Sequence, residues 1–409
     1  MAHVNGKATV RTRPHDRRAQ ILRTAAGLFH ERGYHGVGVD EIAAAVGVSG
    51  PALYKHFRGK HDLLWHAIDS GMARFESVTA DGLEELLDAM VALALERREL
   101  GVLWQRESRN LNEPERAEFR HRLRRNAERN AELLRRARPE LGERDALLLS
   151  WGITALVSSP SHHRAAPDGY PALLRAMVSA VARSTSLIAA PPVPVPEEAQ
   201  TTRASRREAI LAAATRLFGR NGFAAVSNDD IGAATGVTGP TVYKHFASKT
   251  EILITALNRG GEALQLALDR ALAHAPDRAG ALSAVVASYA DFAAGHPDLI
   301  GVLITEVTHL PPEERHANRR KQHRYVAEWT RLLRAERPEL SEPEALALVH
   351  GALTLINDLV RLPVTRSRAH LNDELAGLAL DVLRSGGTAR AGAERETADR
   401  PRDTTRRSA

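Results

Sequence analysis

Apolar residues recur every three to four positions along most of the chain, and no stretch alternates apolar and polar residues persistently. One run of five apolar residues shares a single helix face: Ile21, Leu22, Ala25, Leu28 and Phe29. The same spacing returns later in the chain: Ile210, Leu211, Ala214, Leu217 and Phe218. Helical periodicity without strand periodicity predicts an all-α protein.

The two apolar runs belong to an internal repeat. Residues 17–68 align without a gap to 206–257, a shift of 189 positions, and 24 of the 52 aligned positions are identical. Later blocks also match: "GVLWQRESRNLNEPER" at 101–116 resembles "GVLITEVTHLPPEER" at 301–315, with a shift of about 200. The second copy is therefore predicted to hold an insertion of roughly ten residues, and the chain looks like a duplication of a whole domain.

Each copy opens with the signals of a capped helix. Asp16 and Ser205 occupy equivalent positions, and both residue types cap helix N-termini by accepting backbone N–H groups. Gly33 and Gly222 follow the apolar runs, where glycine commonly ends a helix. A first helix of similar length is thus predicted in both copies.

A shorter second helix is predicted over 39–46 and 228–235. Its inner face is expected to carry two apolar residues per copy: Ile42 with Ala45, and Ile231 with Ala234. "GVSGP" and "GVTGP" then supply a glycine turn, and their Ser49 and Thr238 are suited to cap a third helix. Two short helices joined by such a turn are typical of the helix-turn-helix.

The third helix is predicted to carry the octamers "GPALYKHF" (50–57) and "GPTVYKHF" (239–246), which are identical at six positions. In the first octamer Leu53 and Phe57 would face the core, and Ala52, Lys55 and His56 would face outward, with Tyr54 beside them. A basic, hydroxyl-bearing face on the second helix of a helix-turn-helix suits the major groove of DNA. One such motif alone would usually be an amphipathic helix with solvated side chains, but the duplicated context favours DNA binding.

Composition narrows the classes of protein and of function that remain. Lys and Arg number 56 against 50 acids, a formal charge of +6, which permits nucleic-acid binding without requiring it. There are no cysteines, and the longest uncharged apolar run, 146–161, is shorter than the ~20 residues of a membrane span. We therefore expect a soluble, cytoplasmic protein. Nucleophile-elbow, P-loop and complete dinucleotide motifs are absent, and histidines lack ligand spacing, so neither enzyme activity, cofactor nor metal is predicted.

"IAAAVGVSGPALYKHFRGKHDLL" and "IGAATGVTGPTVYKHFASKTEIL" resemble the DNA-binding domain of the TetR family of bacterial transcriptional regulators. The tandem arrangement is similar to the double-headed TetR-type repressors of actinobacteria. The resemblance implies two TetR-like units, each a three-helix helix-turn-helix domain followed by a helical effector and dimerisation body. It also implies a double-stranded DNA operator and a small-molecule effector as partners, with no membrane.

The resemblance implies DNA contacts at equivalent positions of both copies. Phosphate contacts are expected from hydroxyl, imidazole and ammonium groups: Tyr54, His56, Lys60, Tyr243, His245 and Lys249. The turn and the start of the third helix should approach base edges: Ser49, Gly50, Pro51, Ala52, Thr238, Gly239, Pro240 and Thr241. Lys55 and Lys244 would reach guanine or the backbone. Arginines ahead of each unit could enter the minor groove or remain solvated: Arg11, Arg13, Arg17, Arg18, Arg203, Arg206 and Arg207.

The predicted boundaries follow from the repeat: a basic arm (1–14), a first helix-turn-helix domain (15–60), a first body (61–187), a Pro-rich linker (188–203), a second helix-turn-helix domain (204–249), a second body (250–385) and a disordered tail (386–409). Helices near 143–160 with 170–187, and near 342–361 with 371–385, would pair between the copies as an internal pseudo-dimer. Whether the whole chain is a monomer or a homodimer stays open.

Polar and aromatic residues within apolar helices are candidates for an effector pocket: Trp104, Gln105, Glu107, Trp151, Thr305, Glu306 and His309. The competing interpretation is that they are ordinary residues at the edge of the core. Because aromatic residues make up only 4% of the chain, any pocket would be mostly aliphatic and suited to a lipid-like effector. The alternative to an effector-controlled repressor is an architectural protein that is anchored on DNA and binds a protein partner.

Overall fold

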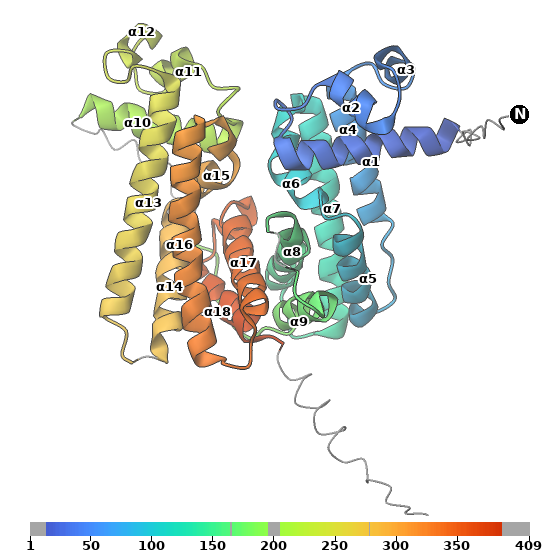
Figure 1. Ribbon diagram of the computed structural model, residues 1–409. Coiled ribbons are helices and arrows are strands. Elements are labelled where there is room, and N and C mark those ends of the chain that lie inside the picture. Colours follow the sequence, from blue (N-terminus) through green and yellow to red (C-terminus); the bar gives the residue numbers. More distant parts are fainter. Residues whose placement is uncertain (1–13, 164–165, 195–204, 278, 387–409) are drawn as a thin grey trace, which may run out of the picture.

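The computed structural model describes residues 14–163, 166–194, 205–277 and 279–386, and every regular element in these ranges is a helix (Figure 1). Within the same ranges, no helix combines the length and the apolar character that crossing a membrane requires. Residues 1–13 of the predicted arm, 195–203 of the predicted linker and 387–409 of the predicted tail lie outside the described residues.

The first copy folds into nine α-helices and two short 3-10 turns within its described residues. In chain order these are α1 (Pro14–Arg32), α2 (Val39–Val46), α3 (Gly50–Tyr54), α4 (Lys60–Glu76), α5 (Leu83–Glu96), α6 (Leu100–Gln105), η1 (Glu107–Asn110), α7 (Glu113–Ala137), α8 (Glu143–Ser158), η2 (Ser159–Ser161) and α9 (Tyr170–Ala182). We call α1–α3 the first head and α4–α9 the first body.

The second copy repeats this order. Its elements are α10 (Arg206–Asn221), α11 (Asn228–Ala233), α12 (Gly239–Val242), α13 (Lys249–Ala273), α14 (Gly280–Gly295), α15 (Pro297–Thr305), η3 (Val307–His309), α16 (Pro312–Glu336), α17 (Glu342–Leu359), η4 (Pro363–Thr365) and α18 (Leu371–Arg384). We call α10–α12 the second head and α13–α18 the second body. The predicted insertion lengthens one helix: α13 has 25 residues, whereas its counterpart α4 has 17.

Two local expectations about the heads were wrong. Helix α1 already includes Pro14, so Asp16 lies in its first turn and does not occupy the N-cap position. Ala45 and Ala234 are exposed, and the buried residues beside Ile42 and Ile231 are Ala43 and Gly232. The turn after α2 folds back over this second position, because the N–H of Val48 bonds the Ala43 carbonyl at 2.9 Å.

Gly232 shows how tightly this turn closes in the second head. A Cβ there would lie 2.7 Å from the Val237 carbonyl oxygen, closer than carbon and oxygen can approach. The Val237 N–H donates to the Gly232 carbonyl at 2.9 Å, which matches the bond between Val48 and Ala43 in the first head. The two turns therefore share one hydrogen-bond pattern, with a closer backbone approach in the second copy.

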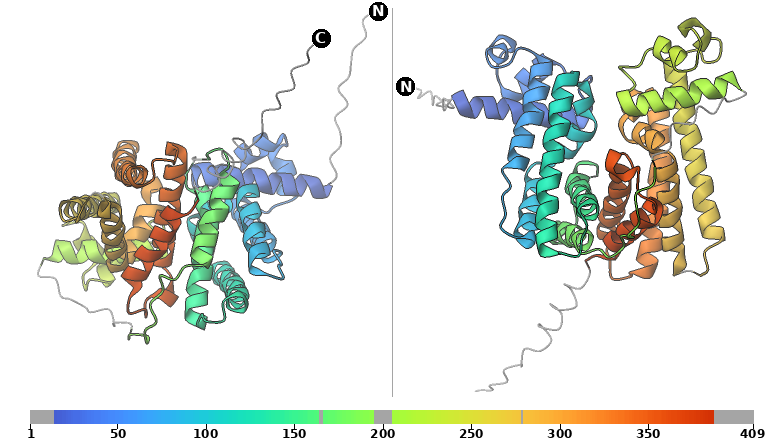
Figure 2. Two further views of the ribbon diagram at one scale, coloured as in Figure 1. Left: turned by 90° about the horizontal axis from the view of Figure 1, so that it is seen from below. Right: turned by 180° about the vertical axis from the view of Figure 1, so that it is seen from behind.

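The two bodies meet along four helices, with α8 and α9 packed against α17 and α18 (Figure 1). Small residues permit the approach: a Cβ at Gly152 would touch Val181 and Leu355, and Gly351 lies against Met177. One apolar core runs from the first head through both bodies, while the second head has a separate core of its own. The views from below and from behind show the same arrangement (Figure 2).

Polar contacts flank this apolar contact between the bodies. Arg368 pairs with Asp145 at 2.7 Å, the hydroxyl of Ser184 donates to Asp381 at 2.6 Å, and Arg144 donates to Ser367 at 2.6 Å. Arg368 is almost completely buried and also bonds the buried Glu374. The bodies are thus joined by directional as well as apolar contacts, which fixes the relative placement of the heads.

Candidate DNA-binding surfaces

Each head presents its third helix through a sharp glycine turn. Gly47 and Gly236 have φ values of 73° and 68°, a left-handed conformation that a side chain disfavours. No heavy atom lies within 4 Å of a Cβ built at either position, so the requirement for glycine here is one of backbone conformation.

The third helices are shorter than the octamers that were expected to form them. Helix α3 covers Gly50–Tyr54 and α12 covers Gly239–Val242, so the basic residues of each octamer follow in a turn. Lys55 keeps right-handed helical angles, φ −69° and ψ −22°, and the Phe57 N–H donates to the Leu53 carbonyl at 3.1 Å, so the helical path continues past Tyr54. Phe57 and Phe246 are buried and anchor the end of each octamer to the head.

The two N-caps differ between the heads. The Ser49 hydroxyl accepts the Ala52 N–H at 3.4 Å, as the sequence predicts. The Thr238 hydroxyl makes no such bond, contrary to expectation, and lies 3.0 Å from the hydroxyl of Thr241. Because Ala52 offers no hydroxyl at the position of Thr241, this pair of hydroxyls is a chemical difference between the two surfaces.

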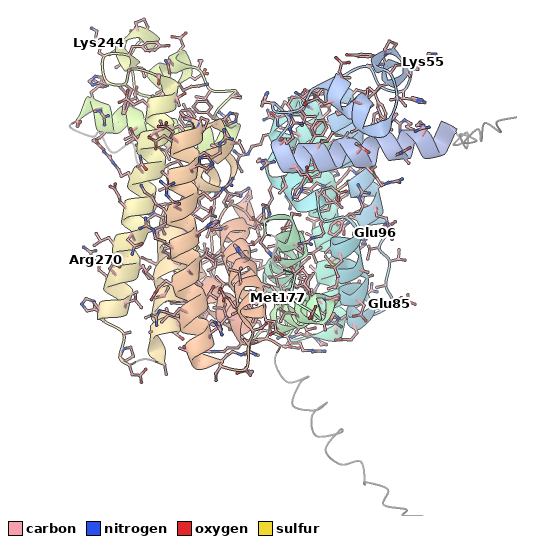
Figure 3. All side chains as sticks on the ribbon, in the orientation of Figure 1. Lys55, Glu85, Glu96, Met177, Lys244 and Arg270 are labelled. Carbon is pink, nitrogen blue, oxygen red and sulfur yellow. The ribbon has the colours of Figure 1, made fainter. Side chains whose placement is uncertain are left out.

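The central residues of the octamers point outward from the same end of the molecule. Tyr54 is 55% exposed and Tyr243 is 59% exposed, an unusual state for side chains of this size. Lys55 and His56 are exposed, as is Lys244, while His245 is half-buried. Figure 3 shows Lys55 and Lys244 at the same end of the molecule, one on each head.

Positions 50–52 and 239–241 are not equally accessible. Pro51 and Pro240 are exposed, and Ala52 and Thr241 are half-buried. Gly239 is buried, and a Cβ there would overlap the carboxylate of Asp229; Gly50 faces Asp40 in the same way. The glycines therefore allow these aspartates to approach the helix N-terminus, and Gly239 offers no surface to a base.

Lys60 and Lys249 point into the heads, contrary to their expected place on the DNA-facing surface. The Lys249 ammonium donates to the carbonyls of Phe223 at 2.8 Å and Val226 at 2.7 Å, and it lies 4.4 Å from the centre of the Phe223 ring. The Lys60 ammonium lies 4.4 Å from the centre of the Tyr34 ring. Desolvation lowers the pKa of both lysines.

The described arginines at the start of each unit also pack on the heads. Arg18 lies over the Phe57 ring at 4.9 Å and Arg207 lies over the Phe246 ring at 4.1 Å. The side chain of Arg206 donates to the Thr235 carbonyl at 3.1 Å. Arg18 and Arg207 thus brace the ends of the octamers, and Arg206 holds the turn after α11, whereas Arg11, Arg13 and Arg203 lie outside the described residues.

The seven candidate pocket residues do not converge on one cavity. Three surface hollows have volumes of about 750, 540 and 270 Å³, and none of these three is lined by any of the seven. Trp104 packs between Phe75 and Phe119, with ring centres 5.2 and 6.2 Å away. Trp151 packs on the core, and the Gln105 amide donates to Ser158 and Asp358.

The other four candidates lie where the heads join the bodies. Glu107 and Glu306 are each 2% exposed, and each accepts a backbone N–H from a head. Thr305 is buried beside Glu306, and the His309 ring lies 5.1 Å from the Phe223 ring. Buried carboxylates of this kind hold domains together, so we assign these four residues to the junctions between heads and bodies.

Sequence reasoning missed two buried asparagines in the first body. Asn126 and Asn130 on α7 are 4% and 3% exposed, and the Asn126 Nδ2 and Asn130 Oδ1 atoms lack a hydrogen-bond partner. The sequence signals them only when the two copies are compared. Helix α7 begins at Glu113 and its counterpart α16 begins at Pro312, an offset of 199. At this offset Tyr325 and Trp329 are the counterparts of Asn126 and Asn130. Among the described residues, no group of three or more potential ligands is arranged to hold a metal ion.

Comparison with known proteins gives a family match over each of the two heads. The family model for "Bacterial regulatory proteins, tetR family" matches residues 21–67 and again 210–256. The model for "Tetracyclin repressor-like, C-terminal domain" matches residues 277–360, within the second body. The first body has the same helix order as the second, and the family match in the first unit covers the first head and the start of α4.

Two curated relatives align with part of the chain. The HTH-type transcriptional activator FasR of Mycolicibacterium smegmatis is 40% identical over 84 residues, which is 19% of this chain and 38% of that protein. The HTH-type transcriptional repressor KstR2 of Rhodococcus jostii is 34% identical over 86 residues, 20% of this chain and 42% of that protein. The chain therefore spans about two-fifths of the length of these relatives.

Among solved structures, a TetR-family transcriptional regulator from Bordetella parapertussis is similar to one half of this chain. The alignment has a TM-score of 0.42 and 21% identity, and it covers 46% of this chain and 97% of the other.

Proposed function

Because the chain belongs to the bacterial TetR family and holds two of its DNA-binding domains in tandem, we propose that it is a sequence-specific transcriptional regulator whose two heads bind one operator. The observation that carries this proposal is the exposure of the tyrosine and the lysine of both octamers at the same end of the molecule (Figure 3). The proposal includes repression that a small molecule relieves.

The internal pseudo-dimer is part of the proposal. Its support is the packing of α8 and α9 on α17 and α18, where TetR-type subunits would otherwise meet as separate chains. Because the two heads are not identical, the expected operator has two similar but unequal half-sites. The predicted division into two helix-turn-helix domains, each followed by a helical body, is retained as part of this proposal.

The DNA contacts are assigned to the outward groups of both octamers. Tyr54 and Tyr243 donate to phosphate, together with His56 and His245. Base edges are approached by the residues at the start of each third helix that solvent reaches: Ser49, Gly50, Pro51, Ala52, Thr238, Pro240 and Thr241. Lys55 and Lys244 reach guanine or the backbone, and Lys60 and Lys249 act by holding the head in shape.

Selection of DNA from a random library with the full chain tests this proposal. The expected product contains two related half-sites at a fixed spacing, and native mass spectrometry of the complex should give one chain per duplex. Recovery of a single half-site, or a requirement for two chains on one pair of half-sites, would contradict the tandem arrangement. Weak coating of DNA without sequence preference would favour the architectural alternative.

The effector is assigned to the first body because Asn126 and Asn130, which are buried one turn apart on α7, each keep one amide atom without a hydrogen-bond partner. A buried amide atom without a partner costs roughly 1–3 kcal/mol. In the second body the same region is filled by Tyr289, Tyr325 and Trp329, whose rings pack 5.7–6.3 Å apart. A lipid-like molecule with one hydrogen-bonding group would satisfy the asparagines, whereas aromatic rings stand at the same positions in the second body.

Replacing both asparagines by their counterparts, Asn126→Tyr with Asn130→Trp, tests this assignment. The double variant should still bind the selected DNA but should no longer release it when fatty acids or their coenzyme A esters are added. Tyr325→Asn with Trp329→Asn is the reciprocal variant. If the first variant responded to the same compounds as the natural chain, the first body would not be the sensor.

A further inference from the structure

The two junctions between heads and bodies are built on the same plan. In the first, the buried Glu107 accepts the Tyr34 N–H at 2.8 Å; in the second, the buried Glu306 accepts the Phe223 N–H at 3.0 Å. Tyr34 and Phe223 are equivalent, being 189 positions apart, and each follows the first helix of its head. Each junction thus places a carboxylate from the body under one loop of the head.

The first junction is completed by an arginine of its own unit. Arg106 pairs with Glu107 and donates to the carbonyls of Phe29 at 3.2 Å and His30 at 3.1 Å, near the end of α1. The guanidinium therefore links the buried carboxylate of the body to the last turn of the head helix. Unpaired carbonyls at a helix C-terminus carry negative partial charge, which a cation stabilises.

The second unit has no arginine at this position. The offset of 199 places Thr305 opposite Arg106, and a threonine side chain cannot reach the carbonyls of α10. The guanidinium comes from Arg109, in η1 of the first unit. It donates to Gly219 O at 2.9 Å and Phe218 O at 3.5 Å, the counterparts of His30 and Phe29, and pairs with Glu306 at 2.5 Å.

The first unit supplies an arginine to the second head, but the second unit supplies none to the first head in this way. The counterpart of Arg109 in the second unit is Thr308, which has no guanidinium to return to the first head. Arg109 also donates to the Thr305 hydroxyl at 2.8 Å, so it contacts the very residue that stands in place of the missing arginine. Its side chain is largely enclosed, which makes this contact part of the packed structure and not a loose surface pair.

We propose that Arg109 is a positioning residue that the first unit supplies to the second head, so that the first unit controls how the second head is held. The effect on DNA binding rests on the proposed function of the heads. The contacts of Arg109 with the second head do not depend on that function. Movement of η1, which is followed directly by α7 with its two buried asparagines, would shift the second head without any ligand in the second body. The first head, held by Arg106, does not depend on the second unit in this way.

Backbone hydrogen exchange on the full chain without DNA tests the proposal. Arg109→Ala should speed exchange in α11 and α12 about tenfold, since one charged contact is lost, and should leave α2 and α3 unchanged. Arg106→Ala is the matched control and should do the reverse. Adding Thr305→Arg to Arg109→Ala should restore protection, because it supplies the guanidinium within the second unit, as Arg106 does in the first.

Equal changes in both heads after Arg109→Ala, no change in the second head, or no restoration by Thr305→Arg would overturn the proposal. If Arg109→Ala does not fold, Arg109→Gln, which keeps an amide donor, gives the same contrast between heads. On DNA selected with the natural chain, footprinting of Arg109→Ala should lose protection over one half-site and regain it with Thr305→Arg. If the natural chain bound no DNA, the proposed function would fail while the exchange measurements still decided the role of Arg109.

Discussion

At the scale of single residues, Tyr54 and Tyr243 stand out because each leaves more than half of its surface to solvent. Neither ring contributes to the core of its head, and exposed tyrosines commonly serve binding, where a phenol can donate to a partner. Lys55 and Lys244 follow them in the chain and are also exposed. These four side chains can therefore be removed with little effect on folding.

The double variants Tyr54→Ala with Lys55→Ala, and Tyr243→Ala with Lys244→Ala, test the two heads separately. Each should weaken binding to the selected DNA by about a hundredfold, because a tethered pair loses its avidity when one member fails. The free energy of unfolding should change by less than about 0.5 kcal/mol per residue. Leu266→Ala, at an exposed site on α13, is the control; unchanged affinity in either double variant would show that this head does not contact DNA.

Lys249 gives a second residue-scale prediction, since its ammonium donates to two carbonyls within the head. Lys249→Met keeps the aliphatic stem but leaves two carbonyls without their donor, so thermal unfolding should occur at a lower temperature. The dependence of DNA affinity on salt should keep its slope. A phosphate contact would instead reduce the slope by about 1, which titrations at several salt concentrations would detect.

At the scale of elements, the helix-turn-helix depends on backbone shape at one glycine per head. Gly236→Ala places a side chain at φ 68° without any clash, so it should destabilise the protein by about 1–2 kcal/mol through conformation alone. Gly27→Ala is a matched control within α1, where no atom lies within 4 Å and φ is not positive. It should stabilise by about 0.5–1 kcal/mol, and urea unfolding of both variants would show opposite signs.

Elements were predicted well wherever apolar periodicity and capping residues agreed. The second helix, predicted over 39–46, is found as Val39–Val46, and helices predicted near 143–160 and 342–361 are found as Glu143–Ser158 and Glu342–Leu359. Periodicity repeats every turn and caps mark the ends, so both signals are local. The third helix is shorter than predicted, because α3 ends at Tyr54 and the chain passes through a turn at Lys55 and His56 before the buried Phe57.

The functional surface was harder to predict than the helices. The outward place of Tyr54 follows from its spacing to Leu53 and Phe57, whereas the inward place of Lys249 depends on carbonyls 23 and 26 positions earlier in the chain. Arg109 acts across 197 positions on Glu306, and no local pattern marks such a contact. In the sequence, this contact is indicated only by the comparison of the two copies, in which Arg106 aligns with Thr305.

At the scale of the whole molecule, a cluster of histidines links the first head to both bodies. The His30 ring lies 2.9 Å from the Ser161 carbonyl, and the rings of His163 and His350 stack with centres 4.9 Å apart, across the contact between the bodies. Burial lowers the pKa of His162 to about 3 and that of His350 to about 4. Positive neighbours act in the same direction, since Arg106 and Arg361 lie near His162.

His162 and His350 stay neutral in the folded chain down to about pH 5 but take up protons in the unfolded chain below about pH 6.5. Stability should therefore fall as the pH drops from 6.5 towards the folded values, by roughly 2 kcal/mol per histidine at pH 5. Asp358 acts in the opposite direction: burial raises its pKa to about 6, so its protonation restores part of the loss, about 1 kcal/mol. The net loss between pH 7.5 and pH 5 is on the order of 2–3 kcal/mol.

Urea unfolding of the full chain at pH 7.5 and pH 5 measures this loss. His350→Gln removes one titrating group while keeping a polar side chain in the contact between the bodies, and it should reduce the loss by about 2 kcal/mol. His274→Gln, at an exposed site near the end of α13, is the control and should leave the loss unchanged. If His350→Gln kept the full pH dependence, the acid sensitivity would come from other groups, and the contact between the bodies would not be where protons act on the fold.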